Sequence, residues 1–445
     1  MKTEELFEKG SVWKAIAKMC VPVILVMLVT TAYNMADMLF VGRTGDANQV
    51  AAISLSSPLF MLLMTAGTLI GGGGCAVISQ ALGARDTQRV HSASSACVIL
   101  SIISGVIIAV SVLAAPESIA RLFGADDATL HFTVDYMTIM AVGAPVVIFS
   151  NAFANLLRSD GDTVTAAIVS ILGSVINIVL DPILISGFGM GVSGAAIATV
   201  FSNVVTAVIV LVRVYRKGSV LTLNPIYAIK APRAFWLVFS LGIPSAASNL
   251  LMGITGTLTN RLSIQYGADV VAAMGVGGKA GMIVAMIVMG LALGVQPMLA
   301  YCYGAKNQAR VKETIRKTTV LILITGTALT AVCFLLRRPI AMLFLNDPDL
   351  LELSCHIMTI GLIAMPVIGL NYLAVSYLQA TGFAGRASLL SVARQGLAFV
   401  PALYILHAVF GMEGIFWASA AADIVAVVIS VYYLARKPVT KKASR

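Results

Sequence analysis

Residues 320–336 read VLILITGTALTAVCFLL and contain no charged residue. About 20 residues of this kind are enough for a helix to cross the hydrocarbon core of a bilayer. Lipid offers no hydrogen-bond partners, so a spanning segment must pair its backbone internally, either as a helix or within a closed barrel. Barrel strands alternate apolar and polar residues, and this run does not alternate. The stretch therefore indicates a transmembrane helix.

The rest of the chain has the same character. Of its 445 residues, 59% are hydrophobic and only 11% are charged, and the mean hydropathy is +0.94. Soluble proteins carry about 25% charged residues. A soluble enzyme, a disordered protein and a secreted disulfide scaffold are thereby excluded. The composition predicts an all-α polytopic membrane protein, whose solvent is the lipid bilayer.

The apolar runs predict twelve transmembrane helices. Several exceed the roughly 20 residues that are needed, so they must tilt or extend beyond the bilayer. The expected spans are 14–40, 50–81, 91–115, 132–157, 163–186, 193–213, 236–264, 271–303, 314–336, 354–380, 388–408 and 414–435.

Basic residues gather on one side of these spans. With a cytoplasmic N-terminus, 23 of the 30 Lys and Arg residues fall in the two terminal segments and in the cytoplasmic loops. Only four fall outside, namely Arg43, Arg121, Arg337 and Arg338. This positive-inside bias predicts a multi-pass protein of the cytoplasmic (inner) membrane with both termini in the cytoplasm. The net charge of +10 is explained by these loops, so we expect no nucleic-acid partner.

The chain repeats itself. The run Gly83-Ala84-Arg85-Asp86 recurs 221 residues later as Gly304-Ala305-Lys306-Asn307, and the pair Gly191 and Gly194 recurs 220 residues later as Gly411 and Gly414. Each half holds six spans, so both halves enter the membrane in one orientation, related by a pseudo-twofold axis along the membrane normal.

Two such lobes facing one another form a central cleft, an architecture typical of transporters. A channel or a membrane-bound enzyme does not need it, so we expect no enzymatic activity. We expect an N-lobe at 1–213, a cytoplasmic linker at 214–235, a C-lobe at 236–435 and a basic tail at 436–445.

Acidic residues inside spans are the first candidates for function. A charge at mid-membrane costs about 2.5–3.5 kcal/mol on insertion scales. Three acids lie within spans: Asp37, Asp181 and Asp423. Asp37 and Asp181 are expected at similar depth near the outer ends of spans 1 and 5. Asn177 precedes Asp181 by four residues and therefore shares its helix face.

Other oxygen-bearing side chains are expected in the same layer. Tyr33 and Asn34 lie one turn before Asp37, and Thr199 and Tyr136 come early in spans 6 and 4. This set could bind Na⁺ at Asp37, Asn177, Asp181 and Thr199. It could instead hold protons on the two acids, because removal from water disfavours the charged form. The alternative is structural: the acids cap broken helices or pair with each other.

The remaining charges within spans allow two interpretations each. Asp423, whose counterpart in the first half is Asn203, is either neutralised by Arg394 in a structural ion pair or takes part in function. Lys279 and Arg261 either line the cleft or extend to the membrane surface.

Two backbone features also stand out. Gly71–Gly74 has no preceding strand and no following G-K-[ST], so it is not a phosphate loop and instead predicts close helix packing. Pro22 lies well inside span 1, where it removes a backbone hydrogen bond. It is either a static kink or a bending point in the helix that carries Asp37.

Together these residues resemble the multidrug and toxic compound extrusion (MATE) family over nearly the whole chain. The likeness lies in Tyr33-Asn34-x-x-Asp37, in Asn177-x-x-x-Asp181-Pro182, in Gly194-Ala195-Ala196-x-Ala198-Thr199 and in Gln379-Ala380-Thr381-Gly382. In the family, the first three correspond to a cation site in the N-lobe, and Pro22 corresponds to the helix-1 proline associated with bending. Some members carry acids in helices 7 and 10, which spans 7 and 10 here lack. This places the chain nearer the bacterial DinF-like and MepA-like branches.

The resemblance implies a secondary antiporter without a cofactor. It would export cationic or amphipathic small molecules, such as drugs, in exchange for H⁺ or Na⁺, and work as a monomer. The alternative is a flippase for lipid-linked oligosaccharides, which shares the architecture. A flippase would be expected to have a strongly basic cleft for pyrophosphate, and only Lys279, Arg261 and Arg394 are available.

Overall fold

The computed structural model describes residues 7–435 except 9, 43–46, 217–218 and 346; the side chains of 34–39, 41–42 and 47 are likewise not described. The described part is helical and contains no strand. The all-α prediction is therefore confirmed. Long helices are joined by short connections, as expected where every backbone group must be paired inside the segment.

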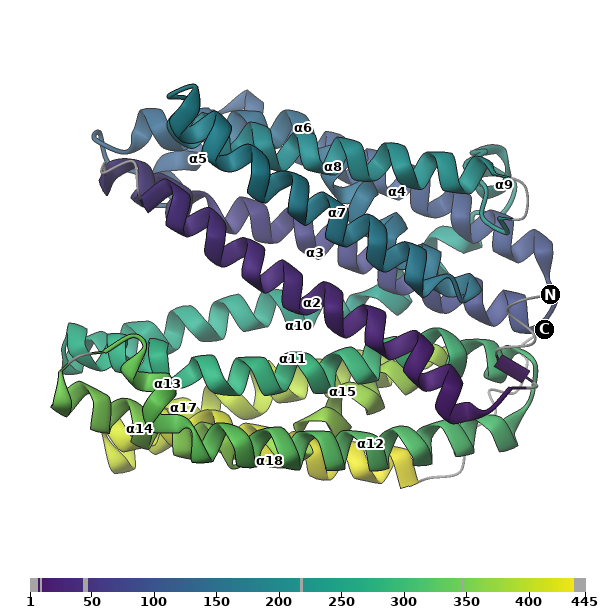
Figure 1. Ribbon diagram of the computed structural model, residues 1–445. Helices are drawn as coiled ribbons and strands as arrows, with labels where there is room; N and C mark the ends of the chain where they lie inside the picture. Colours follow the sequence, from purple (N-terminus) through teal and green to yellow (C-terminus); the bar gives the residue numbers. More distant parts are fainter. Residues whose placement is uncertain (1–6, 9, 43–46, 217–218, 346, 436–445) are drawn as a thin grey trace. The chain divides into compact units, whose positions relative to one another are not determined.

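The first half of the chain, as far as the structure describes it, is built mainly of long helices (Figure 1). Two short helices, α5 (Pro116–Leu122) and α9 (Ile226–Ile229), lie in its connections. The long ones are α2 (Val12–Gly42), α3 (Ala47–Gly83), α4 (Thr87–Ala114), α6 (Leu130–Leu156), α7 (Thr163–Pro182), which continues as a π-helical turn η3 (Ile183–Gly187), and α8 (Gly191–Tyr215).

The second half repeats this order with two interruptions. Its helices are α10 (Arg233–Ser263), α11 (Ala268–Gly304), α12 (Gln308–Leu335), the short α13 (Arg337–Met342), α14 (Pro348–Leu362), α15 (Met365–Ala380), α16 (Ala384–Val392), the π-helical segment η5 (Ala393–Ala398), α17 (Phe399–Phe410) and α18 (Met412–Ala435).

The number of spans agrees with the twelve predicted. Within the described residues, eleven helices are long and apolar enough to cross a membrane, and the pair α14 and α15 makes up to a twelfth. This pair, however, is not the single straight helix that the run 354–380 suggests, because it bends by 46°. Pro366 lies in the first turn of α15, where it can supply no N–H to the preceding helix.

The helices form two compact units that do not coincide with the two halves of the sequence. Unit 2 comprises residues 25–246, and unit 1 comprises residues 1–24 together with 247–445. The first parts of α2 and α10 are therefore exchanged: each belongs to the unit built mainly from the other half. Pro22 and Pro244 lie two residues before the last residue of these exchanged parts, Ile24 and Ala246.

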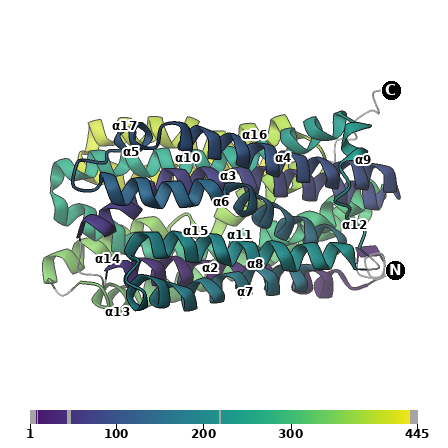
Figure 2. The ribbon, with the colours of Figure 1, turned by 90° about the horizontal axis from the view of Figure 1, so that it is seen from above.

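Within unit 2, α3 packs against α4 and α6 (Figure 2). The four-glycine run of α3 permits this close packing, as predicted. A Cβ on Gly71 would lie 2.9 Å from the Ala152 carbonyl oxygen of α6, and one on Gly73 would collide with the Val238 carbonyl of α10. Glycine at these positions therefore brings two helix backbones against α3.

Unit 1 repeats the arrangement around α11, which packs against α12, α14 and α15. Gly294, 221 residues after Gly73, approaches the exchanged part of α2, since a Cβ there would lie 2.7 Å from Cys20 Cα. The thiol of Cys20 donates to the Leu291 carbonyl at 3.3 Å. The duplication thus extends to the glycine contacts that hold each exchanged segment.

The repeated Gly-Ala-Arg/Lys-Asp/Asn run is a helix-to-helix turn. Arg85 and Lys306 adopt positive φ angles of 57° and 59°. The next residue caps the following helix: Asp86 accepts from the Arg89 backbone N–H at 2.9 Å, and Asn307 accepts from that of Arg310 at 3.0 Å. Side-chain oxygens at such positions satisfy N–H groups that have no partner within the helix.

The second repeated motif, Gly191-x-x-Gly194 and Gly411-x-x-Gly414, also has a structural reason. The first glycine of each pair has a positive φ, 54° and 58°, which favours glycine. The second lies against the preceding helical segment: a Cβ on Gly194 would be 2.9 Å from the Leu184 carbonyl carbon, and one on Gly414 would collide with the Leu406 carbonyl. Each pair therefore permits a tight reversal between two spans.

Candidate functional site

The structure brings Asn177, Asp181 and Thr199 together inside unit 2. Asn177 and Asp181 lie one turn apart on α7, and Thr199 lies on α8, which packs against α7. All three are buried, with exposed fractions of 2%, 0% and 3%. The tight reversal at Gly194 places the start of α8 against the end of α7, which explains how residues 18 positions apart become neighbours.

The Asn177 amide connects the other two residues. In the amide orientation that satisfies both of its polar atoms, its nitrogen donates to Asp181 Oδ2 at 3.1 Å and its oxygen accepts from the Thr199 backbone nitrogen at 3.1 Å. In the opposite orientation, the nitrogen donates to Thr199 Oγ1 at 3.3 Å. The cluster therefore offers a carboxylate, an amide and a hydroxyl, which are the oxygen donors that hard cations prefer.

The other predicted members are placed less fully. Asp37 and Asn34 lie on α2, but their side chains are outside the described part of the structure. Tyr33 is half-buried on the same helix, and Tyr136 is buried near the start of α6. The prediction that Asp37 belongs to the same cluster as Asp181 thus stays a prediction. Among the described residues, no group of three or more His, Cys, Asp and Glu side chains could hold a metal ion.

A polar network extends the cluster in a way that the sequence analysis missed. Asn203 Nδ2 donates to the Thr199 carbonyl at 2.8 Å, and its Oδ1 accepts from Ser150 Oγ of α6 at 2.6 Å. Ser202 Oγ donates to the same carbonyl at 2.9 Å. The spacing of four residues between Thr199 and Asn203 was visible in the sequence, whereas the partner Ser150 was not.

In unit 1, Asp423 and Arg394 form an ion pair, the first of the two alternatives considered above. Arg394 Nε lies 2.7 Å from Asp423 Oδ1, and the side chains are only 15% and 8% exposed. Arg394 Nη1 also donates to the Tyr372 hydroxyl at 3.0 Å, and the guanidinium lies 5.0 Å from the centroid of that ring. Three helical segments, η5, α18 and α15, therefore meet at one buried cation.

The two units differ at this equivalent position. Asn203, the counterpart of Asp423, joins a neutral network with Ser150, whereas Asp423 has a charged partner. The two remaining basic candidates of unit 1 form no ion pair within the described residues. Lys279 lies 5.0 Å from the centroid of the Phe344 ring, and Arg261 is exposed on α10.

Comparison with known proteins agrees with this architecture. A model of the MatE family matches the chain twice, over residues 22–183 and 244–405. The two matches confirm the internal duplication, because each falls in one half of the repeat.

Full-length relatives are transporters. The multidrug export protein MepA of Staphylococcus saprophyticus is 32% identical over 448 residues, covering 100% of this chain and 99% of that protein. MepA of Staphylococcus aureus is 31% identical over 448 residues with the same coverage. Among solved structures, the outward-facing conformation of a multidrug resistance MATE family transporter of the MOP superfamily superposes with a TM-score of 0.91 at 25% identity, covering 98% of this chain and 97% of that chain.

The helices long enough to span, the duplication and these relatives identify a multi-pass cell-membrane transporter of the multidrug-export type. The chain belongs to the MatE family, the multidrug and toxic compound extrusion transporters.

Proposed function

We propose that this protein is a secondary antiporter that exports amphipathic cations in exchange for H⁺ or Na⁺, coupled at Asp181. The observation that supports the proposal best is the complete burial of Asp181 beside Asn177 and Thr199. A carboxylate costs several kcal/mol to bury unless a partner or a bound cation compensates it. Such a site is negatively charged when empty and neutral when it holds a cation. Cation binding would therefore remove most of the free-energy cost of burying the carboxylate.

The Asn177 amide suits such an exchange because it both donates and accepts. In the amide orientation that satisfies both of its polar atoms, its nitrogen donates to the carboxylate at 3.1 Å. Its oxygen can accept from a protonated acid or coordinate Na⁺ after rotation of the amide. Thr199 offers a hydroxyl with the same dual capacity. A fixed basic partner such as Arg394 would favour the charged form only.

Coupling then follows from linkage. If the cation binds one conformation more tightly, it shifts the population towards that conformation, and a substrate that prefers the other conformation is released. The effect is reciprocal, so substrate binding must weaken cation binding by the same factor. Asp37 is the second carboxylate of this proposed site, and the proline at 22 in the same helix is the proposed bending point.

A transport assay tests the proposal directly. The purified protein in proteoliposomes should move a fluorescent lipophilic cation when a H⁺ or a Na⁺ gradient is imposed separately, and the coupling ion is the one whose gradient drives transport. Transport should stop when the gradient is collapsed by an ionophore and should not need ATP. Transport driven by ATP in sealed vesicles without ion gradients would refute antiport.

We also propose that both termini lie in the cytoplasm. The support is the excess of Lys and Arg in the loops that share a side with the termini. A reporter fused after Arg445 that is active only in the cytoplasm should therefore be active, and one that is active only outside should be silent. The opposite pattern would reverse the orientation.

A further inference from the structure

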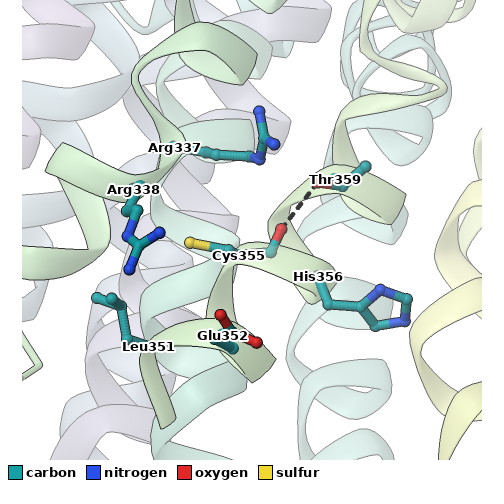
Figure 3. Close-up of a pocket in the computed structure, with 7 residues that line it drawn as sticks. All are labelled: Arg337, Arg338, Leu351, Glu352, Cys355, His356 and Thr359. Carbon is teal, nitrogen blue, oxygen red and sulfur yellow. Dashed lines mark hydrogen bonds between the residues drawn. The ribbon is translucent and has the colours of Figure 1, made fainter. Parts of the chain in front are cut away.

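A pocket lies between α13 and α14 in unit 1, far along the chain from the polar cluster of unit 2. It has a volume of about 290 Å³ and is lined by Arg337, Arg338, Leu351, Glu352, Cys355, His356 and Thr359. Figure 3 shows the two arginines entering from α13 and the other five side chains from α14. Pockets for drug-sized ligands run from about 300 to 1,000 Å³, so this one suits a smaller polar group.

The pocket contains two basic residues although it lies on the predicted outer side, where basic residues are rare. Arg337 and Arg338 are two of only four basic residues that the positive-inside distribution leaves on the outer side. Neither forms an ion pair with any residue that the structure describes: Arg337 Nη1 donates to the Phe334 carbonyl at 2.8 Å and its guanidinium lies over the Phe334 ring. Both arginines line the pocket, and a guanidinium without a carboxylate partner can bind an anionic oxygen group.

The acidic side chain and the imidazole of the pocket differ in whether they already have a charged partner. His356 Nε2 lies 3.0 Å from Glu413 Oε1 of α18, so this imidazole already has an anionic partner. Glu352, in contrast, is exposed and forms no ion pair within the described residues. The pocket therefore presents two guanidiniums and one carboxylate to a ligand, a pattern that matches a group carrying both a phosphate and an amine.

Exposed apolar side chains lie close along the chain to the two arginines of the pocket. α12 ends at Leu335, the end of a span, and Leu335 and Leu343 are 75% and 78% exposed. Leu336, just before α13, and Met342, its last residue, are exposed as well. Exposed apolar side chains at the end of a transmembrane helix are solvated by acyl chains, and arginines at this level lie among lipid headgroups.

We propose that this pocket binds the headgroup of an aminophospholipid, with the phosphodiester on Arg337 and Arg338 and the ammonium group on Glu352. The exposed apolar residues next to the arginines, Leu335, Leu336, Met342 and Leu343, favour a lipid over a free phosphate, because they would pack against acyl chains. The proposal does not depend on the transport function; the proposed orientation of the termini only decides that the leaflet is the outer one.

The test is lipid retention by the full-length protein. The protein is delipidated in mild detergent, then mixed with phosphatidylethanolamine or phosphatidylcholine of identical acyl chains, and bound lipid is measured by native mass spectrometry. We expect wild type to retain phosphatidylethanolamine in preference to phosphatidylcholine, whose methylated amine cannot donate a hydrogen bond to Glu352. The double variant Arg337→Gln/Arg338→Gln should lose retention of both lipids by about tenfold or more, since it loses two charge-assisted contacts.

Two further variants make the test specific. Glu352→Gln should keep binding but lose the preference for phosphatidylethanolamine. Arg121→Gln is the matched control: Arg121 is also predicted to lie on the outer side, but it pairs with Asp127 at 2.8 Å, so its loss should leave retention unchanged. Thermal unfolding of each variant in detergent, expected to be unchanged, separates lost binding from lost folding.

Three outcomes would overturn the proposal. The first is undiminished retention in the arginine double variant with intact folding. The second is equal retention of the two lipids by wild type. The third is displacement of bound lipid by free phosphoethanolamine at the concentration at which the lipid itself binds, which would show that a soluble phosphate is the ligand.

Discussion

Asp181→Asn is expected to reduce ion-driven efflux to the level of empty liposomes while leaving membrane insertion and folding intact. The amide keeps the shape of the side chain but can neither carry a proton nor hold Na⁺ by charge. Because a neutral amide is cheaper to bury than a carboxylate, the protein should be at least as stable as wild type. Asp127→Asn is the matched control, since Asp127 is an exposed carboxylate of the same unit and should be dispensable.

The measurement is transport of a lipophilic cation in proteoliposomes under an imposed gradient, with thermal unfolding in detergent as the check on folding. Asp37→Asn should give the same loss, an expectation that comes from the sequence. Efflux that persists at the wild-type rate in both variants would end the assignment of the coupling site to this unit.

Because cation and substrate binding are linked, the same proposal can also be tested by measuring substrate affinity. If Asp181 takes up protons, the affinity of wild type for the substrate should fall as the pH drops, because proton and substrate favour different conformations. In Asp181→Asn this dependence on pH should be lost. If Na⁺ is the coupling ion, added Na⁺ should weaken substrate binding at fixed pH in wild type but not in the variant.

Arg394→Ala is expected to destabilise the protein by about 3–5 kcal/mol, because it leaves the buried Asp423 carboxylate without its counter-charge. The ion pair is short, 2.7 Å, and its side chains are only 15% and 8% exposed. The double variant Arg394→Leu/Asp423→Leu should recover most of this loss, since replacing both members removes the cost of burying charge. The free energy of unfolding can be followed by denaturant titration in mixed micelles.

The chain contains its own control for this prediction. Arg121 and Asp127 form an ion pair of 2.8 Å whose side chains are 53% and 89% exposed. Because solvent screens this pair, Arg121→Ala should change stability by less than about 1 kcal/mol. Equal effects of the two substitutions would show that burial of Arg394 is not what makes its ion pair important. A double variant that folds but does not transport would assign Asp423 a role in function beyond structure.

The sequence alone determined the fold class, the number of spans and the duplication. In a lipid bilayer, these three properties depend on local sequence. A run such as 320–336 can pair its backbone hydrogen-bonding groups only as a helix, whatever it packs against. Helical periodicity likewise sufficed to place Asn177 on the same face as Asp181, because residues four apart on one helix are neighbours. The glycine motifs were visible as repeats, although their collisions with the carbonyls of Val238 and Leu406 were not.

Only the tertiary structure decided which distant residues meet. It showed that α14 and α15 bend by 46° at a break, that the first parts of α2 and α10 are exchanged between the units, and that Tyr372 joins Arg394 and Asp423. It also assembled the pocket of Arg337, Arg338 and Glu352 from two helices that the sequence could not orient. Periodicity orders side chains around one helix axis, whereas these features depend on how separate helices rotate and approach one another, which is set by packing summed over the whole unit.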